Sequence, residues 1–209
     1  MAEIKTLEAV AVSHYFDVSR PFLQRVFTGE KRRMLRAVDD VSFVIAAGTT
    51  FALVGESGCG KSTIARLAVG LYQPGDGDIL FEDKALSSVR SQPAMRRRMN
   101  MIFQDPYASL NPRWRVSDIV AESIRAFRLA TRPHEVQGRV GALLAQVGLT
   151  VRDGEKYPHE FSGGQRQRIS IARALAAHPE FLVCDEPMPV ADTTRIFSSR
   201  GFRIRRQST

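Results

Sequence analysis

The chain has 209 residues, of which 44% are hydrophobic and 25% are charged, and its formal net charge is +8. This length supports one sizeable hydrophobic core, and no apolar run approaches the roughly 18 residues of a membrane-spanning helix. We therefore expect a cytosolic chain whose membrane contacts go through a partner. The two cysteines, Cys59 and Cys184, cannot form a disulfide framework. We expect both to be small buried residues in a reducing compartment.

The first half of the chain alternates strand and turn signals, with one helical pattern. In chain order we predict strands at residues 7–16, 38–45 and 50–54, a helix at 62–71 and a strand at 78–81. The polar residues 17–36 predict a loop or insertion. A strand that runs into glycines and then into a helix, followed by another strand, indicates an α/β fold.

The second half adds helices between short strands. In chain order we predict a strand at residues 101–103, a loop at 106–112, helices at 116–129, 135–147 and 164–177, and a buried strand at 181–184. The last 17 residues, 193–209, hold five arginines and no acidic residue, so they carry five of the eight excess charges. We expect this tail to be solvated and disordered, with nucleic-acid binding as the alternative.

A glycine-rich loop between the strand at 50–54 and the following helix fits the pattern G-x4-G-K-[ST]. Its glycines allow backbone N–H groups to point at phosphate, Lys61 reaches the β- and γ-phosphates, and the Ser62 hydroxyl ligates Mg²⁺. A chance glycine-rich turn is the alternative, but the Lys-Ser pair and the flanking elements argue against it. The predicted phosphate-binding residues are Gly55, Glu56, Ser57, Gly58, Cys59, Gly60, Lys61, Ser62 and Thr63.

Two carboxylates follow the apolar strand at 181–184, at the edge where open α/β sheets bind ligands. Asp185 suits Mg²⁺, directly or through water, and Glu186 is the candidate general base for in-line hydrolysis. An isolated Asp-Glu pair would more simply be a solvated strand end. The phosphate-binding loop upstream favours the catalytic interpretation.

A second anion site is predicted at Ser162, Gly163 and Gly164. The serine is placed to cap a helix, and the two glycines leave its first N–H groups accessible. Taken alone, this pattern is also common in linkers and caps. One chain rarely needs two γ-phosphate sites, whereas two copies of it do.

At this point the sequence resembles a known family. Residues 161–168 resemble the signature of ABC transporter ATPases, and Gln104 resembles the glutamine of their Q-loop. Longer strings at residues 104–113 and 157–165, with the polar insertion before Arg36, resemble the dipeptide and oligopeptide importer ATPases. The resemblance implies an α/β fold with a P-loop NTPase (RecA-like) core, an antiparallel β subdomain and a helical signature subdomain at about residues 105–165.

The resemblance also implies a function. It implies an ATP- and Mg²⁺-dependent hydrolase that energises a bacterial peptide importer from the cytoplasmic face of the inner membrane. Two ATP-binding subunits, identical or related, would dimerise head to tail so that Ser162, Gly163 and Gly164 of one complete the γ-phosphate site of the other. Gln104 would sense metal and water. The other implied partners are two membrane-spanning permeases and, indirectly, a periplasmic peptide-binding protein, with no nucleic acid.

For the adenine base, the family uses an aromatic residue near the end of the first strand. The spacing favours Phe16 over Tyr15 for this stacking role, and a core or edge aromatic is the alternative. We therefore expect Phe16 to form part of the nucleotide site.

The family pattern ends after Pro187, beyond which only Asp192, assigned to the nucleotide site, stays in register. The last histidine is His178, so we expect this chain to lack the switch histidine of the family and the strand that carries it. We expect an incomplete nucleotide-binding domain at residues 1–192, without its C-terminal strands, and an altered reading frame after about Met188. The alternatives are a non-catalytic remnant that at most binds nucleotide and an ABC-type DNA-repair ATPase, although no coiled-coil or zinc insertion is visible.

Overall fold

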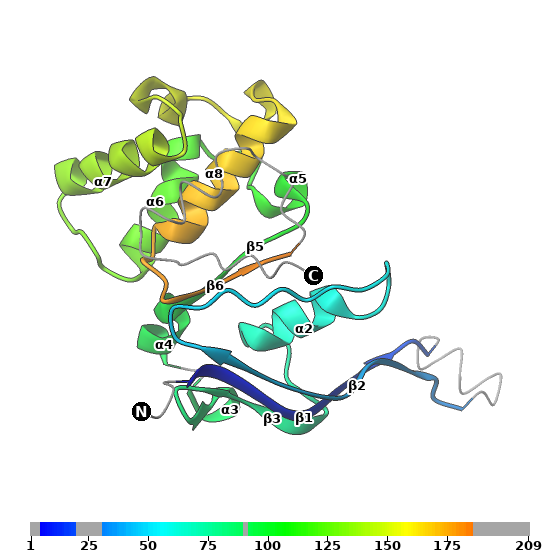
Figure 1. The fold of residues 1–209 in the computed structure, drawn as a ribbon. Coiled ribbons are helices and arrows are strands. Elements are labelled where there is room, and N and C mark those ends of the chain that lie inside the picture. The colour runs from blue at the N-terminus through cyan, green and yellow to red at the C-terminus, as the bar shows by residue number, and fades with distance from the viewer. Residues whose placement is uncertain (1–4, 20–30, 90–91, 186–209) are drawn as a thin grey trace. The chain divides into compact units, whose positions relative to one another are not determined.

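The computed structural model describes residues 5–19, 31–89 and 92–185 (Figure 1). The chain forms two compact units, one of Met1–Ala47 with Phe51–Val89 and one of Gly48–Thr50 with Arg90–Thr209. Glu186, Asp192 and the basic tail lie outside the described residues, so the expectations about the reading frame and the C-terminal strands, which concern the same part of the chain, stay predictions.

The first unit is built on an antiparallel sheet with strand order β2-β1-β3-β4. Its elements are β1 (Lys5–Asp17), β2 (Met34–Ala46), α2 (Lys61–Ala68), β3 (Asp76–Phe81), β4 (Lys84–Ala85) and α3 (Leu86–Val89). Leu7 and Ala9 of β1 and Ile79 and Phe81 of β3 are buried. Because alternate side chains of a strand point to one face, this spacing buries one face of the sheet. The predicted antiparallel β subdomain is confirmed.

Strand β2 begins earlier than predicted. Residues 34–36 were expected at the end of a polar loop, yet Met34 pairs with Asp17 and Arg36 pairs with Tyr15. The Arg36 guanidinium lies 5.4 Å from the centre of the Tyr15 ring and forms a 2.7 Å ion pair with Asp39. Cross-strand contacts therefore outweigh the polar local composition.

The prediction of a strand at residues 50–54 is wrong. Residues 51–56 have no strand structure, and Phe51, Leu53 and Val54 are 45%, 37% and 92% exposed. A β-strand exists only within a hydrogen-bonded ladder. No strand in the described ranges pairs with this segment, and Phe51 stacks instead on Phe43 of β2, with ring centres 5.1 Å apart.

The second unit combines a short parallel pair of strands with a cluster of helices. Its elements are α4 (Pro93–Arg98), β5 (Met99–Ile102), α5 (Pro106–Ser109), α6 (Val116–Ala126), α7 (Pro133–Gln146), the 3₁₀ turns η1 (Val151–Glu155) and η2 (Pro158–Glu160), α8 (Gly163–Leu175) and β6 (Phe181–Cys184). Strands β5 and β6 run parallel, with Met99 opposite Phe181 and Ile102 opposite Cys184.

The core of the second unit lies among α6, α7 and α8, which gather in Figure 1. The fully buried side chains include Val116, Ile124, Leu144, Ile169 and Leu175. Each helix therefore turns an apolar face inward, as the helical spacing of its sequence predicts. No helix in the described ranges is both long enough and apolar enough to cross a bilayer.

Two short helices of this unit were not predicted. Helix α4 went unrecognised, and α5 occupies residues expected to form a loop. Asp105 caps α5, because its Oδ1 accepts a hydrogen bond of 2.7 Å from the Tyr107 amide, and Pro106 takes the first helical position. An Asp-Pro pair is a signal for the start of a helix. The helix went unpredicted because four residues are too few to show a helical periodicity.

Gly77 provides a test of the first unit. Its φ is +75°, and a Cβ there would overlap the carbonyl oxygens of Val10 and Ala11. We expect Gly77→Ala to lower the free energy of unfolding by at least about 2 kcal/mol. Gly138→Ala, in α7 with open space around it, is the matched control and should raise stability by up to about 1 kcal/mol. Urea unfolding measures the free energy of unfolding of both variants. Similar values for Gly77→Ala and Gly138→Ala would show that the backbone at position 77 does not require glycine.

Candidate functional site

The predicted phosphate-binding loop, residues 55–63, belongs to the first unit and leads into α2. The Lys61 ammonium donates hydrogen bonds to the carbonyl oxygens of Gly55 at 2.9 Å and Glu56 at 2.7 Å. The Cys59 amide donates to the Glu56 carbonyl oxygen at 3.3 Å. These bonds fold the loop tightly and hold a cation against its backbone.

Gly60 is required at the junction of loop and helix. It adopts φ of +94°, and a Cβ there would overlap the carbonyl oxygen of Ala37 in β2. Within the described residues, α2 has neither a side-chain cap nor an acidic residue in its first turn. Its positive end is therefore not neutralised by such a side chain, which favours binding of an anion.

Both cysteines are exposed, so the expectation that they are buried is wrong. Cys59 lies in a bend of the glycine-rich loop, and Cys184 is the last residue of β6, which among the described strands pairs with β5 alone. The described residues therefore leave both cysteines exposed.

Gln104 and Asp185 follow two paired strands of the second unit. Gln104 follows β5 by two residues and is exposed, whereas Asp185 follows β6 directly and is only 4% exposed. The Asp185 amide donates to the Ile102 carbonyl oxygen at 3.0 Å, which extends the parallel ladder. Because the carboxyl ends of parallel strands share one edge, both side chains originate from the edge where ligands bind.

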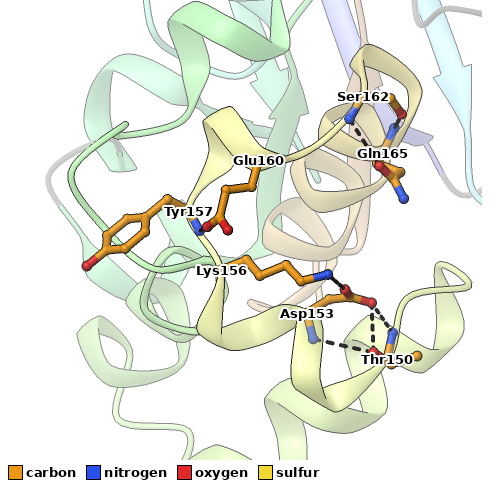
Figure 2. Close-up of polar contacts among 7 residues, drawn as sticks. All are labelled: Thr150, Asp153, Lys156, Tyr157, Glu160, Ser162 and Gln165. Carbon is orange, nitrogen blue, oxygen red and sulfur yellow. Dashed lines mark hydrogen bonds and ion pairs between the residues drawn. The ribbon is translucent and has the colours of Figure 1, made fainter.

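The signature turn forms the cap that the sequence predicts. The Ser162 hydroxyl accepts a hydrogen bond from the Gln165 amide at 3.3 Å, and Gln165 Oε1 accepts one from the Ser162 amide at 3.0 Å (Figure 2). A Cβ at Gly163 or Gly164 would meet no atom within 4 Å in the part of the chain that the structure describes. Packing within these residues therefore does not require either glycine, and the first turn of α8 is open to approach.

Two similar turns precede the signature (Figure 2). Asp153 Oδ2 accepts hydrogen bonds from the Thr150 amide at 2.9 Å and hydroxyl at 2.7 Å, and the Glu160 carboxylate accepts one from the Tyr157 amide at 2.6 Å. Sequence reasoning missed these residues, although the T-x-x-D spacing of a capping box could have identified the first turn. Local bonds thus order the segment that leads into Ser162.

Asp153 is the acidic residue most strongly perturbed in this segment. Hydrogen bonds from Lys156, 2.7 Å away, and from the backbone and hydroxyl of Thr150 lower its pKa from 3.8 to about 2. The ionised carboxylate therefore favours the folded state.

Phe16 lies in an aromatic cluster of the first unit. Its ring centre is 4.7 Å from His14 and 5.6 Å from Tyr72, and His14 stacks on Tyr72 at 5.3 Å. Tyr72 was missed, and its position shortly after α2 carried no distinctive signal. The Tyr15 ring instead lies under the Arg36 guanidinium. The role of Phe16 in stacking on adenine stays a prediction.

The lowered pKa of Asp153 gives a pH-dependent prediction. Its contribution to stability is present above about pH 4 and should be lost as pH falls towards 2, because the folded-state pKa lies below the unfolded value. We expect Asp153→Asn to lower the free energy of unfolding by about 1 kcal/mol at pH 6 and by clearly less at pH 3. Urea unfolding at both pH values checks this. Glu155→Gln, in the same turn, is the control, and a loss independent of pH would contradict the prediction.

The chain is similar to ATP-binding proteins of oligopeptide transport. It is 51% identical over 166 residues to the oligopeptide transport ATP-binding protein OppF of Bacillus subtilis (strain 168), an alignment that covers 78% of this chain and 54% of the relative. For the protein of the same name from Escherichia coli (strain K12), identity is 45% over 164 residues, with 78% and 49% covered. The chain thus spans about half the length of the curated relatives it matches.

Solved structures show the same fold. An ATP-binding subunit of an ABC transporter superposes with a TM-score of 0.72 at 22% identity, covering 94% of this chain and 75% of that one. The dimeric ATP-binding cassette MJ0796 bound to ADP and Pi gives 0.74 at 22% identity, covering 95% and 85%. The fold class predicted from the sequence is confirmed. Because the ABC transporter family model matches residues 38–189, this chain belongs to the ABC transporter family.

Proposed function

We propose that this chain is the ATP-binding and ATP-hydrolysing subunit of a bacterial peptide importer. The names of the relatives, oligopeptide transport ATP-binding proteins, support this proposal. The structural observation that carries it is the open first turn of α8 at Gly163 and Gly164, present in the same chain as the phosphate-binding loop. A chain with two phosphate-facing helix starts suits a dimer in which each copy supplies one half of each site.

In that arrangement, residues 55–63 of one copy hold the phosphates, and Ser162, Gly163 and Gly164 of the other approach the γ-phosphate. Glu186 polarises the attacking water. Phe16 stacks on the adenine, and Asp192 completes the nucleotide site. The helix dipole and the backbone N–H groups at both helix starts favour the negative charge of the phosphates.

The proposal includes Mg²⁺ held with the nucleotide. The Ser62 hydroxyl, the Gln104 amide oxygen and the Asp185 carboxylate are oxygen donors, which Mg²⁺ prefers. Gln104 and Asp185 fit this role because they leave adjacent parallel strands at one edge. The bound ion would neutralise developing phosphate charge, and Gln104 would report its presence to the rest of the second unit.

The implied partners are a second ATP-binding subunit, identical or related, and two membrane-spanning permeases. A periplasmic peptide-binding protein would act through the permeases. The chain would then work as a peripheral subunit on the cytoplasmic face of the inner membrane. The names of the relatives support transport of oligopeptides as the process it serves.

A second function, nucleotide binding without turnover, is favoured by one observation. Residues 51–56 enter the phosphate-binding loop without strand pairing, and Val54 is 92% exposed. A loop whose incoming strand is not held in a sheet can bind phosphate but holds its geometry less rigidly. Steady-state phosphate release separates the two functions.

Lys61→Ala tests nucleotide binding. Removing a cation that contacts the β- and γ-phosphates should weaken ATP affinity at least about tenfold, because a hydrogen bond to a charged group contributes roughly 1.5–3 kcal/mol. Titration with a fluorescent ATP analogue measures the change. Lys84→Ala, which removes an exposed lysine of β4 in the same unit, is the matched control. Equal affinities of Lys61→Ala and the parent chain would rule out the site.

Glu186→Gln tests turnover. Loss of the general base should lower steady-state phosphate release at least about a hundredfold while ATP affinity stays within about twofold. Glu122→Gln, on the exposed side of α6, is the control with the same chemical change. A parent chain that binds ATP and releases no phosphate would support the non-catalytic function instead.

A further inference from the structure

One face of α8 contacts α5, the short helix that follows Gln104. Arg166, Ser170 and Arg173 are spaced by four and three residues, so they form a single stripe along α8. Each of the three contacts α5, and all of these residues belong to the second unit. The helix that begins at the signature turn is therefore joined along its length to the helix that begins after the Q-loop glutamine (Figure 1).

The first of these contacts is between Arg166 and Tyr107. The Arg166 guanidinium carbon lies 3.7 Å from the centre of the Tyr107 ring. The arginine is 6% exposed and the tyrosine 64% exposed, so the ring covers an otherwise enclosed cation. A guanidinium stacked on an aromatic face at this distance is a favourable cation–π contact.

The same guanidinium also holds the turn that enters the signature. Arg166 Nε donates to the Pro158 carbonyl oxygen at 2.7 Å, and Nη2 donates to that of His159 at 3.4 Å. Both carbonyls belong to η2, which ends two residues before Ser162. One side chain thus touches the helix after Gln104 and the turn before the signature serine.

The other two contacts of the stripe converge on Ser109, the last residue of α5. The Ser109 and Ser170 hydroxyls are 3.2 Å apart, and Arg173 Nη1 donates to the Ser109 carbonyl oxygen. At the other end of α5, the Asp105 carboxylate caps the helix one residue after Gln104. The α5 backbone is therefore fixed at both ends, and α8 holds the end remote from Gln104.

An apolar side chain would cost less free energy to bury at position 166 than arginine does. Arg166 Nη1 is buried and has no hydrogen-bond partner among the described residues. Burying a cation with one unsatisfied nitrogen costs free energy that an apolar side chain of similar size would not. The contact therefore calls for an explanation beyond packing.

We propose that Tyr107 and Arg166 are positioning residues that couple the Gln104 loop to the signature turn. A displacement of α5 is transmitted through the stacked guanidinium to η2, and so to Ser162. The inference rests on the proposed function, because that function gives Gln104 and Ser162 roles in the same catalytic cycle. Coupling through one contact would let a metal sensed at Gln104 influence the turn offered to the other copy's nucleotide.

Amide hydrogen exchange of the full chain without nucleotide tests the coupling. We compare Tyr107→Leu, which removes the aromatic face, with Tyr107→Phe, which keeps it. Tyr107→Leu should speed exchange about fivefold both in residues 105–110 and in residues 158–166, the loss expected for one cation–π contact. Tyr107→Phe should match the parent chain. Because Tyr107 is largely exposed, both variants should fold.

Two controls make the result specific. Trp114→Leu removes another exposed aromatic side chain near α5, one that is not stacked on Arg166, and should leave exchange in residues 158–166 unchanged. Arg166→Met is the reciprocal variant, and it should speed exchange in residues 105–110. Faster exchange confined to residues 105–110 in Tyr107→Leu would overturn the proposal, as would a Tyr107→Phe chain that behaves like Tyr107→Leu.

Turnover measurements then connect the coupling to catalysis. If the proposed function holds, Tyr107→Leu should lower kcat several-fold with little change in the KM for ATP, since Tyr107 and Arg166 belong to the second unit and the predicted phosphate-binding loop belongs to the first. An unchanged kcat would overturn the positioning role. A parent chain without turnover would count against the proposed function. Amide hydrogen exchange would still test the coupling between α5 and the signature turn, because it is measured without nucleotide.

Discussion

The constraint on which both predicted anion sites depend is that backbone N–H groups at the start of a helix need acceptors. The two helices meet it differently. Helix α2 starts at Gly60 without a side-chain cap in the described part of the chain, whereas α8 starts with the reciprocal Ser162–Gln165 pair. The first start favours an anion as acceptor, and the second has its own side-chain acceptor and an open approach at Gly163 and Gly164.

The start of α8 is the last of several turns in the second unit that are held by local side-chain hydrogen bonds. Successive turns capped by Asp153, Glu160 and Gln165 order the chain from residue 150 to the start of α8 without a long helix or strand. Helix α8 then buries Ile169 and Ile171 in the core and uses another face for α5. If Ser162 binds phosphate as we propose, a turn held by these bonds needs little reorganisation on binding.

The sequence predicted several local features well. The Ser162 cap and the apolar strand before Asp185 depend on a few neighbouring residues, and the structure contains both of them. Cys59 and Cys184 were assigned wrongly, because burial depends on what surrounds a segment. The prediction of a strand at residues 50–54 was wrong for the same reason. Its apolar composition says nothing about whether a neighbouring strand is present to pair with it.

By itself, the sequence determined which residues have the chemistry suited to phosphate and metal, because the chemistry of glycine, lysine, serine and carboxylate groups is set by residue type and short spacing. Only the tertiary structure decided that β5 and β6 pair in parallel, so that Gln104 and Asp185 share an edge. It also placed Arg166 between Tyr107 and η2. These contacts join residues about 60 to 80 positions apart or depend on a side chain's direction, and neither is encoded in a local pattern. The prediction of a phosphate-binding loop thus needed only nine residues, whereas the contacts that join α5 to α8 required the folded chain.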